Sequence, residues 1–296
     1  MCAYTASRRG TIFVEDATLL SHRHFLGDQH IMRLQAPRLA ANAQPGSFVH
    51  LQCDLSLPMR RPMSLMRVNR ESGWADILYK VHGQGTGLLA KRLPGDTLSV
   101  IGPIGQPFKL QAYRRRPLLI GGGVGIPPML FLAEHMKSQT GLAPFVIMGS
   151  EVPFPFTAKP STIMVPGVPD GIIAAVPLLE DWGIPSRLAS LQGFPGCHDG
   201  FVTDLARCWL DHLGAGSGAD TEIEIFACGP TPMLKAVRHL AMDYALPCQI
   251  SLEEYMACAV GGCAGCVVRI ETENGPAMKR ICVDGPVFEA ESVVFP

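Results

Sequence analysis

The sequence lacks a surplus of charge of either sign. Its 296 residues include 25 basic and 26 acidic side chains, which gives a formal net charge of −1 at pH 7. Proteins that bind nucleic acid usually carry a basic face, and this composition offers no such footprint. Internal repeats and low-complexity tracts are missing as well. These absences argue against a nucleic-acid partner and against a repeat architecture.

A targeting leader and an uninterrupted apolar span are also missing. The chain opens without a positively charged stretch followed by an apolar core. The longest uncharged run, 117–133, is broken by a cluster of glycines and by Pro127 and Pro128, so it would make a poor transmembrane helix. We therefore expect a cytoplasmic protein without membrane insertion.

Cysteines spaced as disulfide pairs are lacking too. Six of the ten cysteines are scattered through apolar surroundings without pair spacing, which argues against a secreted disulfide protein. These six are Cys2, Cys53, Cys197, Cys208, Cys228 and Cys248.

The other four cysteines form a compact motif near the end of the sequence. Cys258, Cys263 and Cys266 follow a C-x4-C-x2-C spacing, and Cys282 comes later. This spacing is typical of plant-type [2Fe–2S] centres, whose two irons need four thiolates. Nearly all residues between the first three cysteines are glycine or alanine, which let the backbone curl closely around a cluster. A zinc site, which usually has two well-separated cysteine pairs, and plain buried thiols are the alternatives.

The length allows more than one core. With 296 residues, of which 47% are hydrophobic, the chain is long enough for about two domains and a small third one. The predicted fold class is multi-domain α+β. We expect an antiparallel β-barrel domain at 1–113, an α/β parallel-sheet domain at 114–247 and a small cluster domain at 248–296.

Two regions differ in their sequence pattern. Up to about Leu110, short β-rich runs separated by turn residues predict the antiparallel barrel, with one helical interruption at 86–92. After the basic turn 113–116, strands and helices alternate, as expected for a parallel sheet. The proline-rich stretch 151–190 is either a loop excursion or a set of short strands with proline edges. The β-rich runs are 11–14, 30–34, 47–52, 75–81 and 97–101, and the later elements are strands at 117–120, 145–150 and 221–228 and helices at 129–137 and 231–244.

Two turns of the second region suit a nucleotide. The segment 121–125 joins a strand to a helix, where free N–H groups and glycine allow the close approach of a phosphate. It does not fit G-x-G-x-x-G, and a tight strand–helix turn without a ligand is the alternative. The segment 228–230 is another strand end that opens a helix, and two such turns at one sheet edge bracket a crevice.

A third set of residues suits a flavin. In the segment 61–64, Arg61 can pair with a pyrophosphate and Ser64 can reach a flavin edge. The glycine-rich segment 83–87 starts a short helix whose N–H groups can face the same phosphates. Taken singly, Arg61-Pro62 is equally well an exposed turn; together the two segments predict a flavin site.

With these motifs in place, the sequence resembles the electron-transfer subunits of type B dihydroorotate dehydrogenases, a family of ferredoxin reductase-like flavoproteins. The resemblance runs over most of the chain and implies FAD, one [2Fe–2S] cluster and a nicotinamide nucleotide. It assigns the cluster to Cys258, Cys263, Cys266 and Cys282; FAD to Arg61, Pro62, Met63, Ser64, Leu78, Tyr79, Lys80, Gly85 and Thr86; and the nucleotide to Gly121, Gly122, Gly123, Gly125, Cys228, Gly229 and Pro230.

The chemistry of the three groups implies an order of electron flow. A nicotinamide gives up a hydride, a cluster accepts single electrons, and a flavin can handle both. In the family, electrons pass from dihydroorotate through the FMN of a partner catalytic subunit to the cluster, then to FAD and NAD+, in pyrimidine biosynthesis. The resemblance thus implies an FMN-containing partner, two copies of each subunit, and docking near the cluster. No acid–base catalyst is expected, and Ser64 and Cys228 are candidate neighbours of the flavin and nicotinamide.

Some alternatives stay open. A related electron-transfer subunit, such as a sulfhydrogenase gamma subunit or a ferredoxin:NADP oxidoreductase subunit, would share these motifs, and a zinc-stabilised nucleotide-binding protein is a rival of another class. The choice between NAD and NADP and the direction of flow are also open. Two departures from the family are Ala259, where glycine is common, and the long stretch 151–190. Glu253 and Glu254 are expected to be solvated carboxylates.

Overall fold

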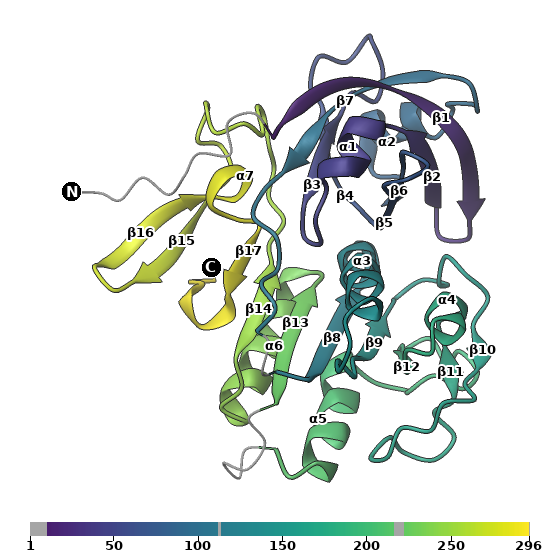
Figure 1. Ribbon diagram of the computed structural model, residues 1–296, viewed down its shortest axis with the longest axis vertical. Helices are drawn as coiled ribbons and strands as arrows, with labels where there is room; N and C mark the ends of the chain where they lie inside the picture. The colour runs from purple at the N-terminus through teal and green to yellow at the C-terminus, as the bar shows by residue number, and fades with distance from the viewer. Residues whose placement is uncertain (1–10, 112–113, 216–221, 296) are drawn as a thin grey trace.

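The structure is a computed structural model that describes residues 11–111, 114–215 and 222–295. Figure 1 shows a curved sheet in one part, an α/β layered part beside it, and a small module built on a hairpin against both. The expected α+β organisation is confirmed. Among the described helices, none is long and apolar enough to cross a membrane. Residue 113, where the predicted basic turn begins, lies outside the described residues.

The first part is a seven-stranded antiparallel sheet that curls into an open half-barrel (Figure 1). Alternating burial along β7 shows why it forms, because every second side chain enters the core while the others face outward. The strand order is β4-β3-β7-β1-β2-β6-β5. The strands are β1 (Phe13–Phe25), β2 (Gln29–Gln35), β3 (Phe48–Leu51), β4 (Arg61–Ser64), β5 (Arg67–Asn69), β6 (Trp74–Lys80) and β7 (Thr97–Ile104), and the helices are α1 (Pro37–Asn42) and α2 (Gly83–Leu89).

Two predicted boundaries in this part are wrong. The first strand continues far beyond the predicted 11–14, to Phe25, because its outward positions are polar or charged and interrupt the apolar pattern. The predicted helix at 86–92 begins earlier, at Gly83, whose positive φ of 75° makes the turn into α2.

The second part is a six-stranded sheet with the order β12-β9-β8-β13-β14-β17. All neighbouring strands are parallel except β17, which runs antiparallel to β14. Helices cover both faces, so the central strands are buried on both sides and read as continuous apolar runs. The strands are β8 (Arg116–Gly122), β9 (Phe145–Gly149), β12 (Ser186–Ala189), β13 (Ile223–Cys228), β14 (Cys248–Ser251) and β17 (Val287–Glu289), and the helices are α3 (Ile126–Lys137), α4 (Pro177–Asp181), α5 (Val202–His212) and α6 (Thr231–Asp243), with the short turn η1 (Gly123–Gly125) before α3.

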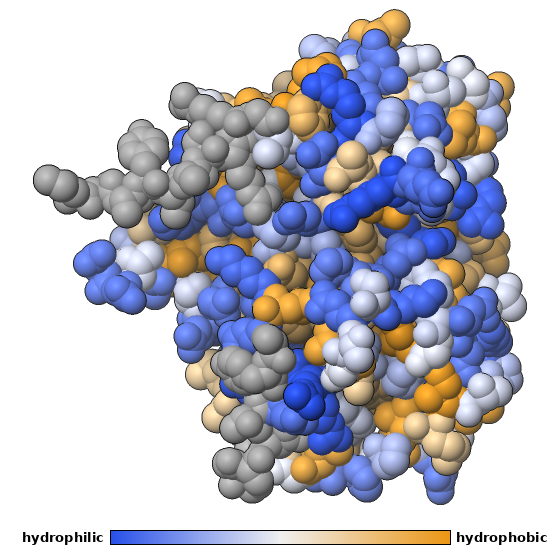
Figure 2. Space-filling model, in the orientation of Figure 1, coloured by the Kyte–Doolittle hydropathy of each residue, from blue (hydrophilic) through white to orange (hydrophobic). Residues whose placement is uncertain are grey.

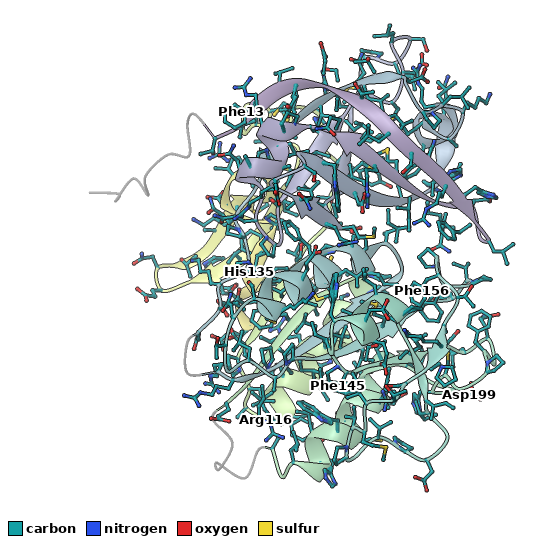
Figure 3. All side chains as sticks on the ribbon, turned by 45° about the vertical axis from the view of Figure 1, so that its right-hand side comes forward. Phe13, Arg116, His135, Phe145, Phe156 and Asp199 are labelled. Carbon is teal, nitrogen blue, oxygen red and sulfur yellow. The ribbon has the colours of Figure 1, made fainter. Side chains whose placement is uncertain are left out.

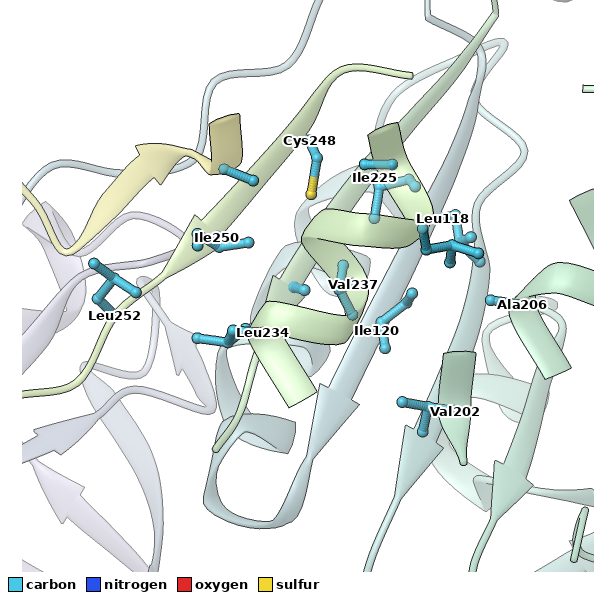
Figure 4. Close-up of a cluster of buried hydrophobic side chains, with 14 of the residues drawn as sticks. Leu118, Ile120, Val202, Ala206, Ile225, Leu234, Val237, Cys248, Ile250 and Leu252 are labelled. Atoms are coloured by element: carbon cyan, nitrogen blue, oxygen red, sulfur yellow. The ribbon is translucent and has the colours of Figure 1, made fainter. Parts of the chain in front are cut away.

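The two faces of this sheet have separate cores. Leu118 and Ile120 of β8 pack with residues of α5 and α6 (Figure 4), whereas Leu119 between them packs with residues of α3. Phe145, labelled in Figure 3, lies at the start of β9 with its ring centroid 5.3 Å from that of Trp209 in α5. The two cores therefore form a rigid scaffold that fixes the ends of the strands.

The proline-rich stretch contains short strands with a proline edge. The strands β10 (Lys159–Pro160) and β11 (Ala174–Ala175) form a two-stranded sheet. Phe156 of this stretch, labelled in Figure 3, stacks on Phe154. The Gln29 side-chain amide donates a 2.6 Å hydrogen bond to the Pro153 carbonyl, so the stretch also contacts the half-barrel.

The residues after β14 leave the sheet and return to it. They form a hairpin of β15 (Val267–Thr272) and β16 (Gly275–Arg280), then α7 (Ile281–Asp284), β17 and the turn η2 (Ala290–Ser292). Because β14 and β17 both belong to the six-stranded sheet, the small module is inserted between two strands of the second part. The division at residue 248 stays a prediction.

A buried network of hydrogen bonds joins Lys109, in the segment between β7 and β8, to the six-stranded sheet. Gln249 of β14 exchanges two hydrogen bonds with the Lys109 backbone and donates a third to Glu224 of β13 at 3.0 Å. Burial raises the pKa of Glu224 to about 7, because the charged form loses its hydration.

Polar and apolar residues are intermixed over the face of the molecule shown in Figure 2.

Candidate functional site

All three parts of the molecule line one cavity of about 1050 Å³. This volume lies at the upper end of the range for ligand pockets and suits a dinucleotide. The half-barrel contributes β4, β6 and the start of α2, the second part contributes Val124 and Thr231, and the small module contributes Gly265 and Pro286. The segment 251–257, which leads from β14 into the module, forms another wall.

We call the half-barrel side of this cavity the flavin face, defined by residues 61–64, 78–80 and 83–86. The structure gathers nearly all predicted flavin residues here. Antiparallel pairing places β4 at an edge of the sheet, and β6 delivers its end to the same side. The predicted residues that line the cavity are Arg61, Pro62, Met63, Ser64, Leu78, Tyr79, Lys80 and Thr86.

Gly85 does not line the cavity, but it shapes the flavin face. A Cβ at Gly85 would lie 3.0 Å from Nε of Arg61, so glycine lets the guanidinium lie against the helix. The same guanidinium donates to the carbonyls of Met59 and Arg60 at 3.0 and 3.1 Å. The Thr86 hydroxyl is bonded to the His82 backbone, which fixes the turn into α2. The face is thus held in shape by its own contacts.

The two predicted nucleotide turns pack directly on each other. A Cβ at Gly125 would lie 2.2 Å from the Cys228 carbonyl oxygen, and one at Gly122 would lie 2.4 Å from Sδ of Met233. A Cβ at Gly229 would meet Cε of Met233 at 2.5 Å. These contacts alone require glycine, as the interpretation of a tight strand–helix turn anticipated. The cavity is lined by their neighbours Val124 and Thr231.

Cys228 is the last residue of β13 and is not among the residues that line the cavity. Its side chain is fully buried, and burial, followed by the charge of Glu253, raises the pKa of its thiol well above the ordinary value. Glu253 lines the cavity, and partial loss of hydration beside the cavity walls raises its pKa too. Glu253 and Glu254 are both exposed to solvent, as expected for solvated carboxylates, but both face the cavity. The position of Glu253 just after a strand of the nucleotide sheet was the available signal.

Three of the four predicted metal ligands lie on the loop 258–266, which we call the cluster loop. The fourth, Cys282, lies in α7. The Sγ atoms of Cys266 and Cys282 are 3.4 Å apart, close to the roughly 3.8 Å expected for two thiolates about 2.3 Å from one tetrahedral metal. The Cys258 sulfur accepts a 3.4 Å hydrogen bond from the Cys263 N–H, and the Cys263 sulfur accepts one from Gly265.

The thiols differ in their electrostatics. Burial opposes ionisation of Cys258, but N–H groups of Val260, Cys263 and Gly262 and the Cys263 thiol together lower its pKa to about 7. Burial, with the adjacent Cys266 thiol, raises the pKa of Cys282 to about 12. A metal that binds thiolates offsets that second effect. No group of three or more His, Cys, Asp or Glu side chains is gathered in metal-binding geometry in the described ranges. The described thiols are thus not drawn together as a closed cage: Cys266 and Cys282 have adjacent sulfurs, and the Cys258 sulfur accepts the Cys263 N–H; four thiols at this spacing suit the donor set of an iron–sulfur cluster.

The backbone of the cluster loop is tightly curled. Gly261 has a positive φ of 85°, and Ala259 and Ala264 have φ values of 55° and 53°, a left-handed conformation that favours glycine. The glycine common in the family at position 259 thus has a conformational reason. Small residues permit this curl and leave N–H groups near the sulfurs.

The half-barrel, the parallel sheet and the cysteine module define a ferredoxin reductase-like flavoprotein oxidoreductase with an iron–sulfur domain. Residues 253–294 match the model of the iron–sulfur cluster binding domain of dihydroorotate dehydrogenase B. A solved structure described as an NADH-dependent reduced ferredoxin-NADP oxidoreductase superposes with a TM-score of 0.74 at 25% identity, covering 94% of this chain and 89% of the other. Phthalate dioxygenase reductase, at 14% identity and a TM-score of 0.57, shares the fold over 90% of this chain and 76% of its own.

Relatives identified by sequence similarity indicate a more specific family. The chain is 33% identical over 279 residues to the electron transfer subunit of dihydroorotate dehydrogenase B (NAD(+)) from Caldanaerobacter subterraneus subsp. tengcongensis, covering 94% of this chain and 98% of the relative. The corresponding subunit from Bacillus caldolyticus is 33% identical over 287 residues, with coverages of 95% and 98%. The chain belongs to the family of dihydroorotate dehydrogenase B electron-transfer subunits. Membership implies a separate catalytic subunit, and the comparisons support the expected FAD, [2Fe–2S] cluster and nicotinamide nucleotide.

Proposed function

We propose that this protein relays electrons between a partner dehydrogenase and NAD+ through a [2Fe–2S] cluster and FAD, in the oxidation of dihydroorotate to orotate. The observation that carries the proposal is the shared cavity. Its walls include the flavin face, the neighbours of both nucleotide turns, and Gly265 between two cluster cysteines. Electron transfer requires such closeness, and the fold supplies it.

In this proposal each wall has a separate binding role. Arg61 offers a cation for a pyrophosphate, and Ser64 offers a hydroxyl to the flavin ring. The turns at 121–125 and 228–230 bring the nicotinamide nucleotide to the opposite wall. Bound FAD would supply the conversion between hydride and single-electron chemistry.

The partner belongs at the cluster loop. Around this loop Tyr255 is 89% exposed and Val260 is 51% exposed, which leaves apolar surface for a subunit contact. We propose an FMN-containing catalytic subunit as the occupant, in an assembly with two copies of each chain. The exposed Cys263 would bring the cluster to that interface.

A visible spectrum of anaerobically purified protein, with iron and sulfide assays, tests this function. We expect flavin and cluster bands, about two irons per chain, and bleaching on addition of NADH. Addition of a dihydroorotate-oxidising FMN subunit should then produce NADH from dihydroorotate and NAD+. A colourless, zinc-loaded protein would contradict the proposal, and bleaching without coupling to that partner would favour a related electron-transfer subunit.

A further inference from the structure

One side chain ties the cluster loop to the helix of the fourth cysteine. The Arg280 guanidinium donates a 2.9 Å hydrogen bond from Nη1 to the Gly261 carbonyl oxygen. Gly261 lies in the cluster loop between Cys258 and Cys263, whereas Arg280 lies at the start of α7, two residues before Cys282. The contact therefore joins the segment with three cysteines to the segment with the fourth.

Gly261 contacts both Arg280 and α7. Its carbonyl oxygen accepts the hydrogen bond from the Arg280 guanidinium. A Cβ at Gly261 would lie 2.6 Å from Cγ2 of Val283, so the loop also packs against α7. A backbone bond from Ile281 N–H to the Cys266 carbonyl, 2.9 Å long, fastens the other end of the loop. Of these fastenings, the Arg280 guanidinium is the one that a side-chain substitution removes directly.

Asp284 orients Arg280. Its Oδ2 accepts the Arg280 backbone N–H at 2.8 Å and lies 3.9 Å from the guanidinium Nε. Both side chains are partly exposed, at 40% and 31%, so their ion pair is weak and offsets only part of the positive charge. The guanidinium Nη1, which contacts the cluster loop at Gly261, presents the positive end of this pair to the cysteines. Reduction adds a negative charge to a cluster, and a nearby cation favours the reduced form.

We propose that Arg280 is a positioning residue for the iron–sulfur cluster: it closes the cluster loop onto α7 and raises the reduction potential of the cluster, with Asp284 as its orienting partner. The inference rests on the proposed cluster site. It adds a role to a residue that is not a ligand.

The test compares purified, cluster-loaded wild type with Arg280→Met, Arg280→Lys and Asp284→Asn. Arg269→Met is the matched control, since Arg269 lies in the same module but pairs with Glu271 on the exposed face of β15. Two quantities are measured: the rate at which cluster absorbance disappears with an iron chelator, and the midpoint potential from an EPR-monitored redox titration. FAD content and thermal melting report on folding.

We expect Arg280→Met to lose its cluster about tenfold faster, the scale of one charge-assisted hydrogen bond. Its ratio of reduced to oxidised cluster at fixed potential should fall about threefold, equivalent to about 28 mV at 59 mV per tenfold. Arg280→Lys should restore most of both properties, because an ammonium can still donate to the Gly261 oxygen. Asp284→Asn should shift the potential upward, because the amide oxygen can still accept the Arg280 backbone N–H while the compensating negative charge is removed.

Equal chelation rates for wild type, Arg280→Met and Arg269→Met would overturn the inference. Equally fast loss of the cluster from Arg280→Lys and Arg280→Met would also overturn it, because the shape of the arginine side chain, and not its donated hydrogen bond, would then be the cause. A potential that Asp284→Asn lowers would also contradict it, and this variant remains informative if Arg280→Met fails to assemble. Loss of FAD together with the cluster in Arg280→Met would indicate a general role in folding. Zinc in the wild type would instead refute the proposed function.

Discussion

The flavin face and the cluster loop border the same cavity but are built in opposite ways. The flavin face consists of two strands and the first turn of a helix, and Arg61 and Thr86 are fixed by contacts within the protein. The cluster loop has no regular secondary structure, and three of its residues adopt positive φ. Among the described residues, its three cysteines and Cys282 of α7 are joined by single contacts rather than gathered into a closed set.

This difference shows how one chain can prepare two sites. A noncovalent ligand such as FAD gains affinity from a face that is already shaped, because little freedom is lost on binding. A cluster forms four metal–sulfur bonds, whose energy can complete a loop that the protein only partly orders. We therefore expect the flavin face to tolerate loss of the cluster, and the cluster loop to depend on it.

The largest effect should follow from Cys263→Ser. The substitution removes a thiolate from the exposed end of the cluster loop, so iron content and transfer to the partner should be lost completely. FAD content and bleaching by NADH should remain, because the flavin face does not depend on this loop. Iron assay, flavin absorbance and coupled turnover check the result. Cys208→Ser, in α5, is the matched control, and transfer that survives without iron would break the comparison.

Gly125→Ala tests the rigid scaffold next. Its new methyl would lie 2.2 Å from the Cys228 carbonyl oxygen, and backbone on both sides prevents relief. We expect a loss of about 3 kcal/mol in the free energy of unfolding, as for strong overpacking. Gly87→Ala, where no atom lies within 4 Å of the new Cβ, should be neutral or slightly stabilising. Urea denaturation of both variants measures the difference, and equal stabilities would contradict it.

Arg61→Ala tests whether the flavin face binds FAD independently of the cluster loop. Loss of the guanidinium should weaken FAD binding about thirtyfold, or about 2 kcal/mol, because a charged donor to phosphate is removed. Cluster content should not change. Fluorescence titration of the apoprotein with FAD measures the dissociation constant, with exposed Arg23→Ala as control. Full FAD retention after dilution would show that Arg61 is a structural residue only.

The stability of the fold is expected to depend on pH through Glu224 of β13. Because the pKa of Glu224 is raised from 4.5 to about 7, the folded chain binds more protons than the unfolded chain between these values. The contribution of Glu224 to stability is thus most favourable below pH 4.5 and becomes less favourable as the pH rises to 7. Glu224→Gln should raise the free energy of unfolding by roughly 1–2 kcal/mol at pH 8 and by much less at pH 5.

Denaturation at the two pH values tests this effect of Glu224. Glu254→Gln serves as a matched substitution of an exposed carboxylate. An equal gain for Glu224→Gln at both pH values would show that burial of the charge is not the cause.

The smallest effect is expected at Ala259. Its φ of 55° is unfavourable for alanine, so Ala259→Gly should relax the cluster loop by about 0.5–1 kcal/mol. Chelation of the cluster should become slower by a few-fold, while FAD binding stays the same. Ala257→Gly, outside the region of positive φ, is the control. Faster cluster loss in Ala259→Gly would mean that chain entropy outweighs strain there.

Sequence patterns predicted the regular parts of the fold well and their limits less well. The parallel strands are marked by apolar runs, because both of their faces are covered. The strand β1 was underestimated, since its outward side chains are polar and only β2 and β7 on either side define its length. The glycine-rich segment 83–87 did mark the start of α2, but the apolar pattern placed the helix three residues too late, because it takes no account of the positive φ that Gly83 adopts.

The sequence by itself determined the family, and it carries the spacing of the four cysteines and of the predicted flavin residues, because these depend on residue types at fixed positions. Only the tertiary structure decided that Glu253 lines the cavity, that the glycines of two turns pack on each other, and that Arg280 reaches Gly261. Each of these contacts joins residues brought together by packing of separate elements. Whether a side chain contacts a residue on another element depends on how the elements pack in three dimensions, which local sequence periodicity does not encode.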